Sequence, residues 1–318
     1  MTREQLWAII KFSNLDKPQI SKILEGSVYR DRSRWKTFID VVLLTLGAGF
    51  LVAGIVFFFA YNWSSLPNNT KLAVAQAVVV LTCLPYFITR LNPLFRNISL
   101  TASAVLVGGM LAVFGQVYQT EALAYDLMFS WTMATSLWVV AARFAPLTLF
   151  WLLLLQVTIA LFLWNKTHID SDLPIYFAIT CANFLALVLP IISSKLRLNL
   201  GSPRWFRSVV SSVCAYYMVS GFAVGLEKTE SPFFIPQLIL SVFVLTYWVR
   251  FGFNNRELES LAIASLSAIA IVCAIIIIKI DEGEAGLIAV TLFVLASVVY
   301  LTKRLLHLKK FWNEEQQS

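Results

Sequence analysis

Apolar residues along the chain gather in runs of about 20, and short polar stretches separate these runs. A helix of this length spans the roughly 30 Å hydrocarbon core of a bilayer. Lipid supplies no hydrogen bonds, so each run has to satisfy its own backbone, as a helix does. The alternating segments of about ten residues that a transmembrane β-barrel requires are not visible in the sequence. We therefore predict an all-α fold, a polytopic transmembrane helical bundle with about ten spans, near residues 37–61, 71–89, 98–120, 124–142, 145–164, 173–193, 207–226, 233–249, 259–280 and 285–302.

These runs divide the chain into three parts. Residues 1–36 are predicted to form a short cytoplasmic helical segment, residues 37–302 the transmembrane helical domain, and residues 303–318 a basic and polar cytoplasmic tail. The first segment lacks the apolar stretch of a signal peptide, so we expect the first span to be an uncleaved anchor. Only Arg143 and Pro146 mark the boundary between the fourth and fifth runs, and the sequence leaves open whether these two are separate crossings.

The charged residues support the same alternation. If the amino terminus is cytoplasmic, every Lys and Arg falls on the cytoplasmic side except Lys71, Lys166, Lys228 and Lys279. Retention of Lys and Arg on the cytoplasmic side sets the orientation of membrane proteins. We therefore predict that both termini are cytoplasmic. The net charge of +7 follows from this arrangement, and we predict no nucleic-acid partner.

Tryptophans fall at several of the predicted boundaries. An indole ring is amphipathic and is enriched at the level of the lipid headgroups. We predict that five of these residues anchor the helices there, with membrane lipids as their partners: Trp35, Trp63, Trp164, Trp205 and Trp248.

The predicted spans carry no ionisable residue near their middles. Proton relays and many ion-coupled transporters keep such groups at depth, so these mechanisms are not expected. Uncharged polar residues do occur within the spans, namely Gln76, Gln116, Gln156, Asn183 and Gln237. They either form hydrogen bonds between helices or line a pocket for a neutral or lipid-like ligand. The sequence has no CxxC pair, HExxH or phosphate-binding loop, so we predict no metal site, no cofactor and no catalytic residue.

Small residues in the first and third spans favour close approach of neighbouring helices. We predict helix-packing roles for six glycines: Gly47, Gly49, Gly54, Gly108, Gly109 and Gly115.

Two stretches combine glycine, aromatic and amide residues in a distinctive order. The first span closes in Ala60-Tyr61-Asn62-Trp63, followed by Leu66-Pro67. The third contains Gly115-Gln116-Val117-Tyr118, followed by Tyr125-Asp126-Leu127 and Trp131. Over about residues 1–145, the chain resembles an uncharacterised family of bacterial inner-membrane proteins, a domain of unknown function. This resemblance implies a multi-pass protein of the bacterial inner (cytoplasmic) membrane, and it implies no reaction.

Five polar residues of these stretches fall near one predicted boundary: Asn62, Gln116, Tyr118, Glu121 and Asp126. Amides, a phenol and two carboxylates at headgroup level could bind a polar headgroup, a sugar or a loop of a partner. Alternatively, the same residues staple the helical hairpins, through an asparagine turn and hydrogen bonds to the backbone. The sequence leaves both interpretations open.

Three functions follow from these observations. The leading hypothesis is non-enzymatic binding or transport of a lipid or a small neutral solute. The alternative is a structural or assembly subunit of an envelope complex, with a protein partner in the membrane. A membrane enzyme acting on a lipid-linked group at the outer face is the third, with Glu121, Asp126, His168 and Asp170 as its only candidate acids and bases.

Overall fold

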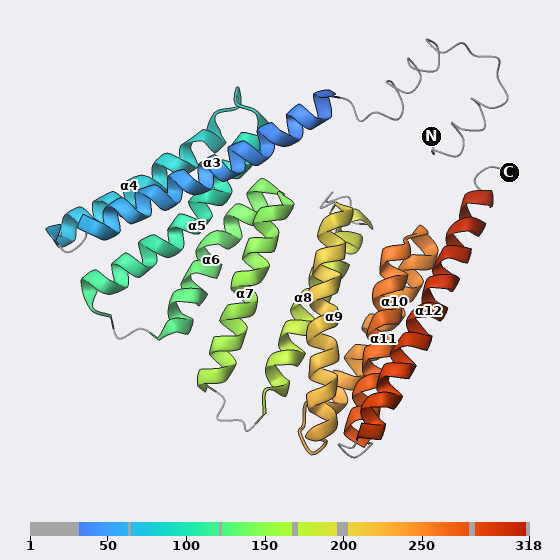
Figure 1. Ribbon diagram of the computed structural model, residues 1–318. Coiled ribbons are helices and arrows are strands. Elements are labelled where there is room, and N and C mark those ends of the chain that lie inside the picture. Colours follow the sequence, from blue (N-terminus) through green and yellow to red (C-terminus); the bar gives the residue numbers. More distant parts are fainter. Residues whose placement is uncertain are drawn as a thin grey trace, which may run out of the picture. The chain divides into compact units, whose positions relative to one another are not determined.

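The computed structural model describes residues 32–62, 65–120, 123–166, 171–195, 203–279 and 284–315. These residues form ten α-helices, labelled α3 to α12, and no strand (Figure 1). Each helix coincides with one of the predicted apolar runs, so the all-α bundle is confirmed. The helices are α3 (Arg32–Asn62), α4 (Asn68–Phe87), α5 (Pro93–Tyr118), α6 (Ala124–Ala142), α7 (Ala145–Lys166), α8 (Leu173–Lys195), α9 (Arg204–Glu227), α10 (Phe234–Asn255), α11 (Leu258–Lys279) and α12 (Glu284–Glu315).

Among the described residues, nine of these helices are long and apolar enough to cross a membrane. The tenth, α6, is less apolar because its 19 residues include Asp126 and several Ser and Thr. Two of its hydroxyl groups are turned inward, since Thr132 and Thr135 are buried. The fourth and fifth runs are separate helices, α6 and α7. The break between them lies at Arg143, whose backbone is left-handed with a φ of 49°.

The chain divides into two compact units, residues 1–71 and 72–318. In the described part of the first unit, α3 is a helix of 31 residues. Near its start, the ring of Trp35 meets the ring of Phe38 edge-on, with centroids 5.6 Å apart. Trp35 is exposed, as the predicted surface anchor requires, whereas Trp63 lies outside the described residues.

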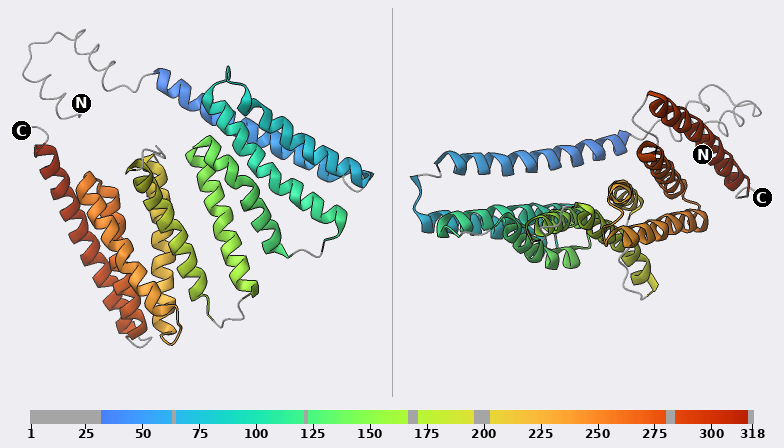
Figure 2. Two further views of the ribbon diagram at one scale, coloured as in Figure 1. Left: turned by 180° about the vertical axis from the view of Figure 1, so that it is seen from behind. Right: turned by 90° about the horizontal axis from the view of Figure 1, so that it is seen from below.

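In the second unit, each helix from α5 to α12 packs against the next one in the chain (Figure 2). Short loops join them, and consecutive helices run antiparallel. Hydrogen bonds from serine hydroxyls of α5 connect it to α4: Ser103 Oγ donates to the Val79 carbonyl at 3.1 Å, and Ser99 donates to the Thr82 carbonyl. Helix α9 contacts α7, α8, α10 and α11. The helices of this unit therefore pack most densely around α9.

Two clusters of buried side chains hold the second unit together. The smaller cluster lies between α5 and α7, around Leu100, Ala104 and Leu147. The larger spans α7 to α11 and includes Met218 and Trp248. The indole of Trp248 is 1% exposed, and its Nε1 donates to Ser211 Oγ at 3.2 Å. The prediction that Trp248 anchors the helix at the membrane surface is therefore wrong. The prediction placed the end of the run at residue 249, whereas α10 continues to Asn255 and carries the indole into the core.

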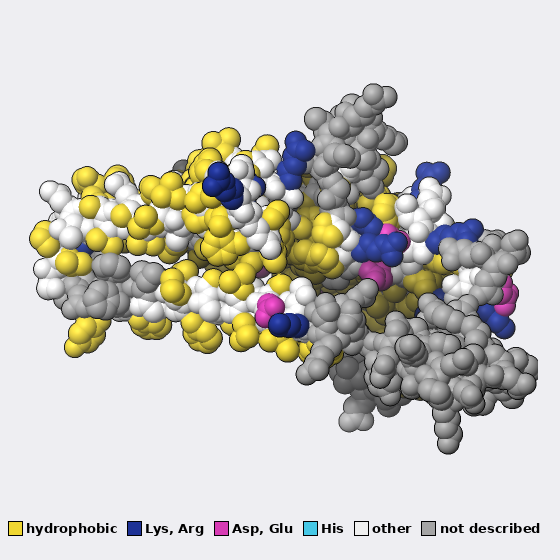
Figure 3. All heavy atoms as spheres, turned by 90° about the horizontal axis from the view of Figure 1, so that it is seen from above, with side chains coloured by type: hydrophobic (Ala, Val, Ile, Leu, Met, Phe, Trp, Pro, Cys, Tyr) yellow, Lys and Arg dark blue, Asp and Glu magenta, His cyan; other side chains and the backbone are white. Residues whose placement is uncertain are grey.

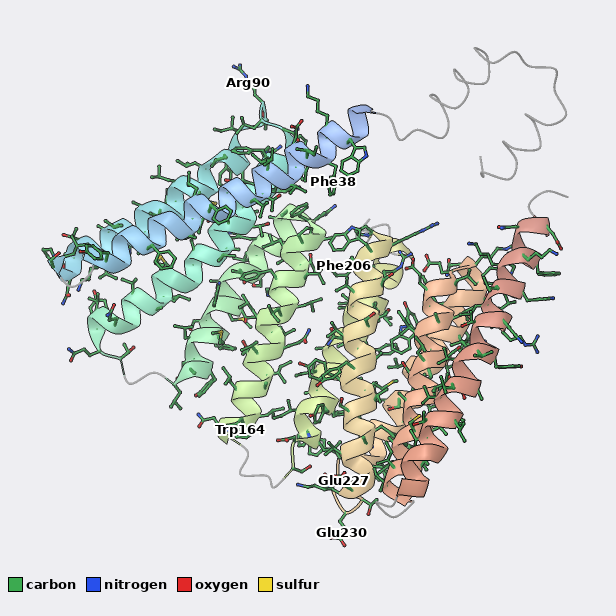
Figure 4. All side chains as sticks on the ribbon, viewed as in Figure 1. Phe38, Arg90, Trp164, Phe206, Glu227 and Glu230 are labelled. Carbon is green, nitrogen blue, oxygen red and sulfur yellow. The ribbon has the colours of Figure 1, made fainter. Side chains whose placement is uncertain are left out.

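Trp164 and Trp205 differ from Trp248, because both are exposed and lie near helix ends. Figure 4 shows Trp164 at the end of the bundle that also carries Glu227 and Glu230. The opposite end carries Arg90 and Phe206, next to Trp205 in the chain. These positions suit rings that contact headgroups.

The predicted packing glycines differ in their surroundings. A Cβ on Gly108 would lie 2.4 Å from the indole of Trp131, whose Nε1 donates to the Ala104 carbonyl at 2.7 Å. Gly108 therefore lets α6 seat its indole directly on α5. A Cβ on Gly109 would meet no described atom within 4 Å, and one on Gly115 only Thr120, in the adjacent turn. For Gly47, Gly49 and Gly54 on α3, the packing role stays a prediction.

We predict that Gly108→Ala destabilises the folded protein by about 1–3 kcal/mol, because its methyl group overlaps the Trp131 ring. Gly109→Ala is the matched control on the next residue, and we expect it to be neutral or slightly stabilising because alanine favours the helix. Thermal unfolding of both purified variants in one detergent measures the difference. Equal midpoints for the two variants would contradict the packing of Trp131 on Gly108.

Candidate functional site

The five residues predicted to converge at one boundary are only partly described. Glu121 lies outside the described residues, and Asn62 ends α3 in the first unit, with a side chain that is not described. Gln116 and Tyr118 lie in the last turns of α5 and are exposed, and Asp126 lies in the first turn of α6. The structure thus brings Gln116, Tyr118 and Asp126 to the same end of the α5–α6 hairpin.

Asp126 has a structural task at this end. Its Oδ2 accepts a hydrogen bond from the Leu123 amide at 3.0 Å, and its own amide donates to the Leu123 carbonyl at 3.0 Å. These two bonds satisfy groups that the first turn of a helix leaves open. The ring of Tyr118 instead packs on Phe114 of its own helix, with centroids 4.6 Å apart. For Asp126, the stapling interpretation is the one that its contacts support.

The second unit contains a set of buried polar side chains that crosses several helices. All the polar residues that are buried in the described chain are uncharged: Ser103, Thr132, Thr135, Gln156, Thr158, Thr180, Asn183, Ser211, Gln237, Ser241 and Ser267. Thr132 of α6 bonds Thr158 of α7 through their hydroxyl groups at 3.0 Å. Near the middle of α7, Gln156 Nε2 donates to Asn183 Oδ1 of α8 at 3.2 Å. We call the residues Thr132, Thr158, Gln156, Asn183 and Gln237 the polar seam.

Gln237 is the fifth member of the polar seam, one turn from the start of α10. Its side chain is fully buried, and its Nε2 donates to the Met218 carbonyl of α9 at 3.1 Å. Its Oε1 is buried without a hydrogen-bond partner. The backbone of α9 comes close here because of Gly221, on which a Cβ would lie 2.7 Å from Gln237 Nε2. Sequence reasoning identified Gln156, Asn183 and Gln237 as polar residues within spans, and the structure shows which of them are paired.

An ion pair at the opposite end of α9 was missed by sequence reasoning. Arg207 of α9 binds Glu257, which lies in the turn between α10 and α11, and Arg204 Nε lies 4.0 Å from the same carboxylate. The Arg207 guanidinium also lies over the Phe251 ring, 5.4 Å from its centroid. Figure 3 is viewed from above, onto the helix ends on the side of Arg207, and shows Lys and Arg side chains there. The pair fastens the α10–α11 turn to α9.

Two comparisons, one with curated proteins and one with solved structures, found no match to the chain. A third comparison used family models. Residues 13–148 match the family described as predicted membrane protein (DUF2157). This match confirms the resemblance to an uncharacterised membrane family. The DUF2157 segment includes Gly108, Gln116, Asp126 and Trp131, whereas most of the polar seam lies after its end.

We predict that Gln156 and Asn183 are energetically coupled. Asn183→Leu leaves the Gln156 amide without its acceptor, so we expect a loss of about 1 kcal/mol of unfolding free energy. The double variant with Gln156→Leu should recover part of that loss, because neither partner then remains unpaired. A double-mutant cycle by unfolding in one detergent should give a coupling of about 0.6–1.7 kcal/mol. Strictly additive effects would show that the bond contributes nothing.

Proposed function

We propose that the chain is a non-enzymatic membrane protein that binds or transports a lipid or a small neutral solute. The observation that carries this proposal is the polar seam, in which uncharged side chains are buried between the helices of the bundle. Hydroxyl and amide groups pair with neutral polar groups of a ligand but do not compensate a buried charge. A site formed by such groups therefore favours a neutral molecule or the uncharged part of a lipid.

An enzymatic role is less well supported by the contacts. Of the candidate acids and bases, Asp126 uses its carboxylate to cap α6, and Glu121, His168 and Asp170 lie outside the described residues. Among the described residues, there is also no group of three or more His, Cys, Asp or Glu side chains able to hold a metal ion.

Native mass spectrometry of the protein, released from its own membrane into lipid nanodiscs, tests the proposal. We expect one lipid or small neutral molecule to be retained in a fixed ratio. The double variant Gln156→Leu with Asn183→Leu should lose it, because the paired amides are gone while neither partner is left unpaired. Gln76→Leu, on the exposed face of α4, is the matched control. Retention of a protein subunit instead would favour an assembly role. Equal retention of the small molecule in all variants would contradict the proposal that the polar seam binds it.

We further propose that the protein lies in the bacterial inner membrane with both termini cytoplasmic. The Lys and Arg of the second unit support this orientation, because they concentrate at the end where α4 stops and α5 begins. These residues are Arg90, Arg96, Arg143, Arg204, Arg207, Arg250, Arg256, Lys303, Arg304, Lys309 and Lys310. The other end carries Asp126, Asp172, Glu227 and Glu230. A bilayer-spanning protein keeps its basic end in the cytoplasm.

Labelling with a membrane-impermeant thiol reagent tests the orientation. In a background without Cys83, Cys181, Cys214 and Cys273, we expect Glu230→Cys to react in intact spheroplasts. Asn255→Cys, at the opposite end of α10, should react only after the membrane is permeabilised. Reversed labelling of the two positions would overturn the orientation.

A further inference from the structure

The end of the second unit where α8 begins, α9 ends and α10 begins holds an unusual group of side chains. Gly221 of α9 sits between Tyr176 of α8 and Gln237 of α10, because a Cβ on Gly221 would lie 2.7 Å from Tyr176 Cβ and from Gln237 Nε2. The ring of Tyr217 lies beside that of Tyr176, with centroids 6.2 Å apart. Three consecutive helices of the chain therefore meet at one point. We call Tyr176, Tyr217, Gly221 and Gln237 the α8–α10 site.

The orientation of the Gln237 amide follows from its neighbour. The Met218 carbonyl can only accept a hydrogen bond, so the Gln237 nitrogen has to face it and the oxygen has to face away. That oxygen is buried and has no partner. A buried acceptor without a donor costs free energy. The side chain thus offers one strong acceptor to any donor that enters.

Two half-buried tyrosines, Tyr176 and Tyr217, also belong to this group. The Tyr217 ring also meets the Tyr216 ring edge-on, with centroids 5.2 Å apart. The rings of Tyr176 and Tyr217 provide apolar surface, and Phe177 of α8 adds to it through contact with Phe233, at 6.0 Å between centroids. The combination of a buried acceptor, two phenol groups and aromatic faces is typical of sites for ligands with one polar group and an apolar body.

The charge of the ligand follows from the depth of Gln237. Tyr176, Tyr217, Gly221 and Gln237 are all uncharged, and the Gln237 amide bonds a backbone carbonyl. The carboxylate of Asp172, just before α8, acts electrostatically on Tyr176. An ammonium group or a phosphate brought against this amide would lose its hydration, and the amide itself supplies no opposite charge. A hydroxyl group loses much less and supplies the donor that Oε1 lacks.

We infer that the α8–α10 site binds the free hydroxyl group of a neutral alcohol, with the hydroxyl donating to Gln237 Oε1. This inference rests on the proposed function and names its ligand class. The hydroxyl belongs to a neutral lipid alcohol or to a free polyol. The rings of Tyr176 and Tyr217 and the position of Gln237 one turn from the start of α10 suit the headgroup depth of a lipid alcohol. Since Oε1 is closed off in this structure, the ligand enters when the amide rotates or when α9 and α10 separate at this end.

The test measures the thermal midpoint of the purified full chain against increasing concentrations of 1,2-dioctanoylglycerol. A ligand that binds only the folded state raises the midpoint in a saturable way. We expect this rise with dioctanoylglycerol. The analogue with its hydroxyl acetylated should give none, because it has no donor. Glycerol forms the second arm: saturation by glycerol at a lower concentration would assign the site to a free polyol within the same class.

Variants connect the effect to the amide. Gln237→Leu should weaken the apparent affinity for dioctanoylglycerol at least tenfold, as loss of one buried hydrogen bond does. Without ligand, the thermal midpoint of Gln237→Leu should be unchanged or higher, because the unpaired oxygen is removed. A midpoint in this range would show that the variant folds. Gln76→Leu on α4 should keep the affinity of the parent. Equal affinity in Gln237→Leu, or equal binding of the acetylated analogue, would overturn the inference.

Failure here is distinguishable from failure of the proposed function. One result would support the proposed function and contradict binding at the α8–α10 site. In that result, the parent and Gln237→Leu retain a neutral lipid or solute in nanodiscs, and the double variant of Gln156 and Asn183 loses it. Absence of any retained lipid or solute, together with no response to dioctanoylglycerol or glycerol, would remove both.

Discussion

The structure depends on one constraint: inside a bilayer, each polar group has to find its partner within the protein. The described helices meet it in two ways. Some hydroxyl groups bond the carbonyl one turn back in the same helix, as Thr180 does to Tyr176 at 2.7 Å. Others connect neighbouring helices, as Ser103 does from α5 to α4 at 3.1 Å. The same constraint keeps charged side chains at the helix ends, where Arg207 and Glu257 meet.

This constraint explains why the sequence predicts the helices so well. A segment that cannot bond to its solvent has to be helical and apolar along its whole length, so hydropathy alone finds it. The sequence left open whether the fourth and fifth runs are separate crossings. The structure shows two separate helices, α6 and α7, with the left-handed residue Arg143 at the break. Hydropathy does not describe how far a helix continues beyond the bilayer. That is why α12 extends to Glu315 although its run was predicted to end at 302.

The candidate sites were less predictable, because hydropathy shows that a polar side chain is deep but not which group it meets. Gln156 and Gln237 look alike in the sequence, yet Gln156 donates to Asn183 of the next helix and Gln237 donates to a backbone carbonyl. Trp248 shows the same limit, since an indole near the end of a run suits both a headgroup and a core. Tyr176 was not singled out because a tyrosine one turn inside a span is common at membrane surfaces.

The contrast between the two glutamines bears on where function lies in the chain. In the described part of the DUF2157 segment, the buried side-chain nitrogen and oxygen atoms all have partners. Trp131 on Gly108 and Asp126 at the start of α6 are examples of groups that are fully used in packing and capping. The Gln237 oxygen, which has none, lies well after that segment. A group whose bonds are complete stabilises the fold, whereas a buried acceptor left open is maintained at a cost in stability. In the described part of the chain, the buried acceptor without a partner therefore lies in α10, where it packs against α9, and not in the segment that matches the family model.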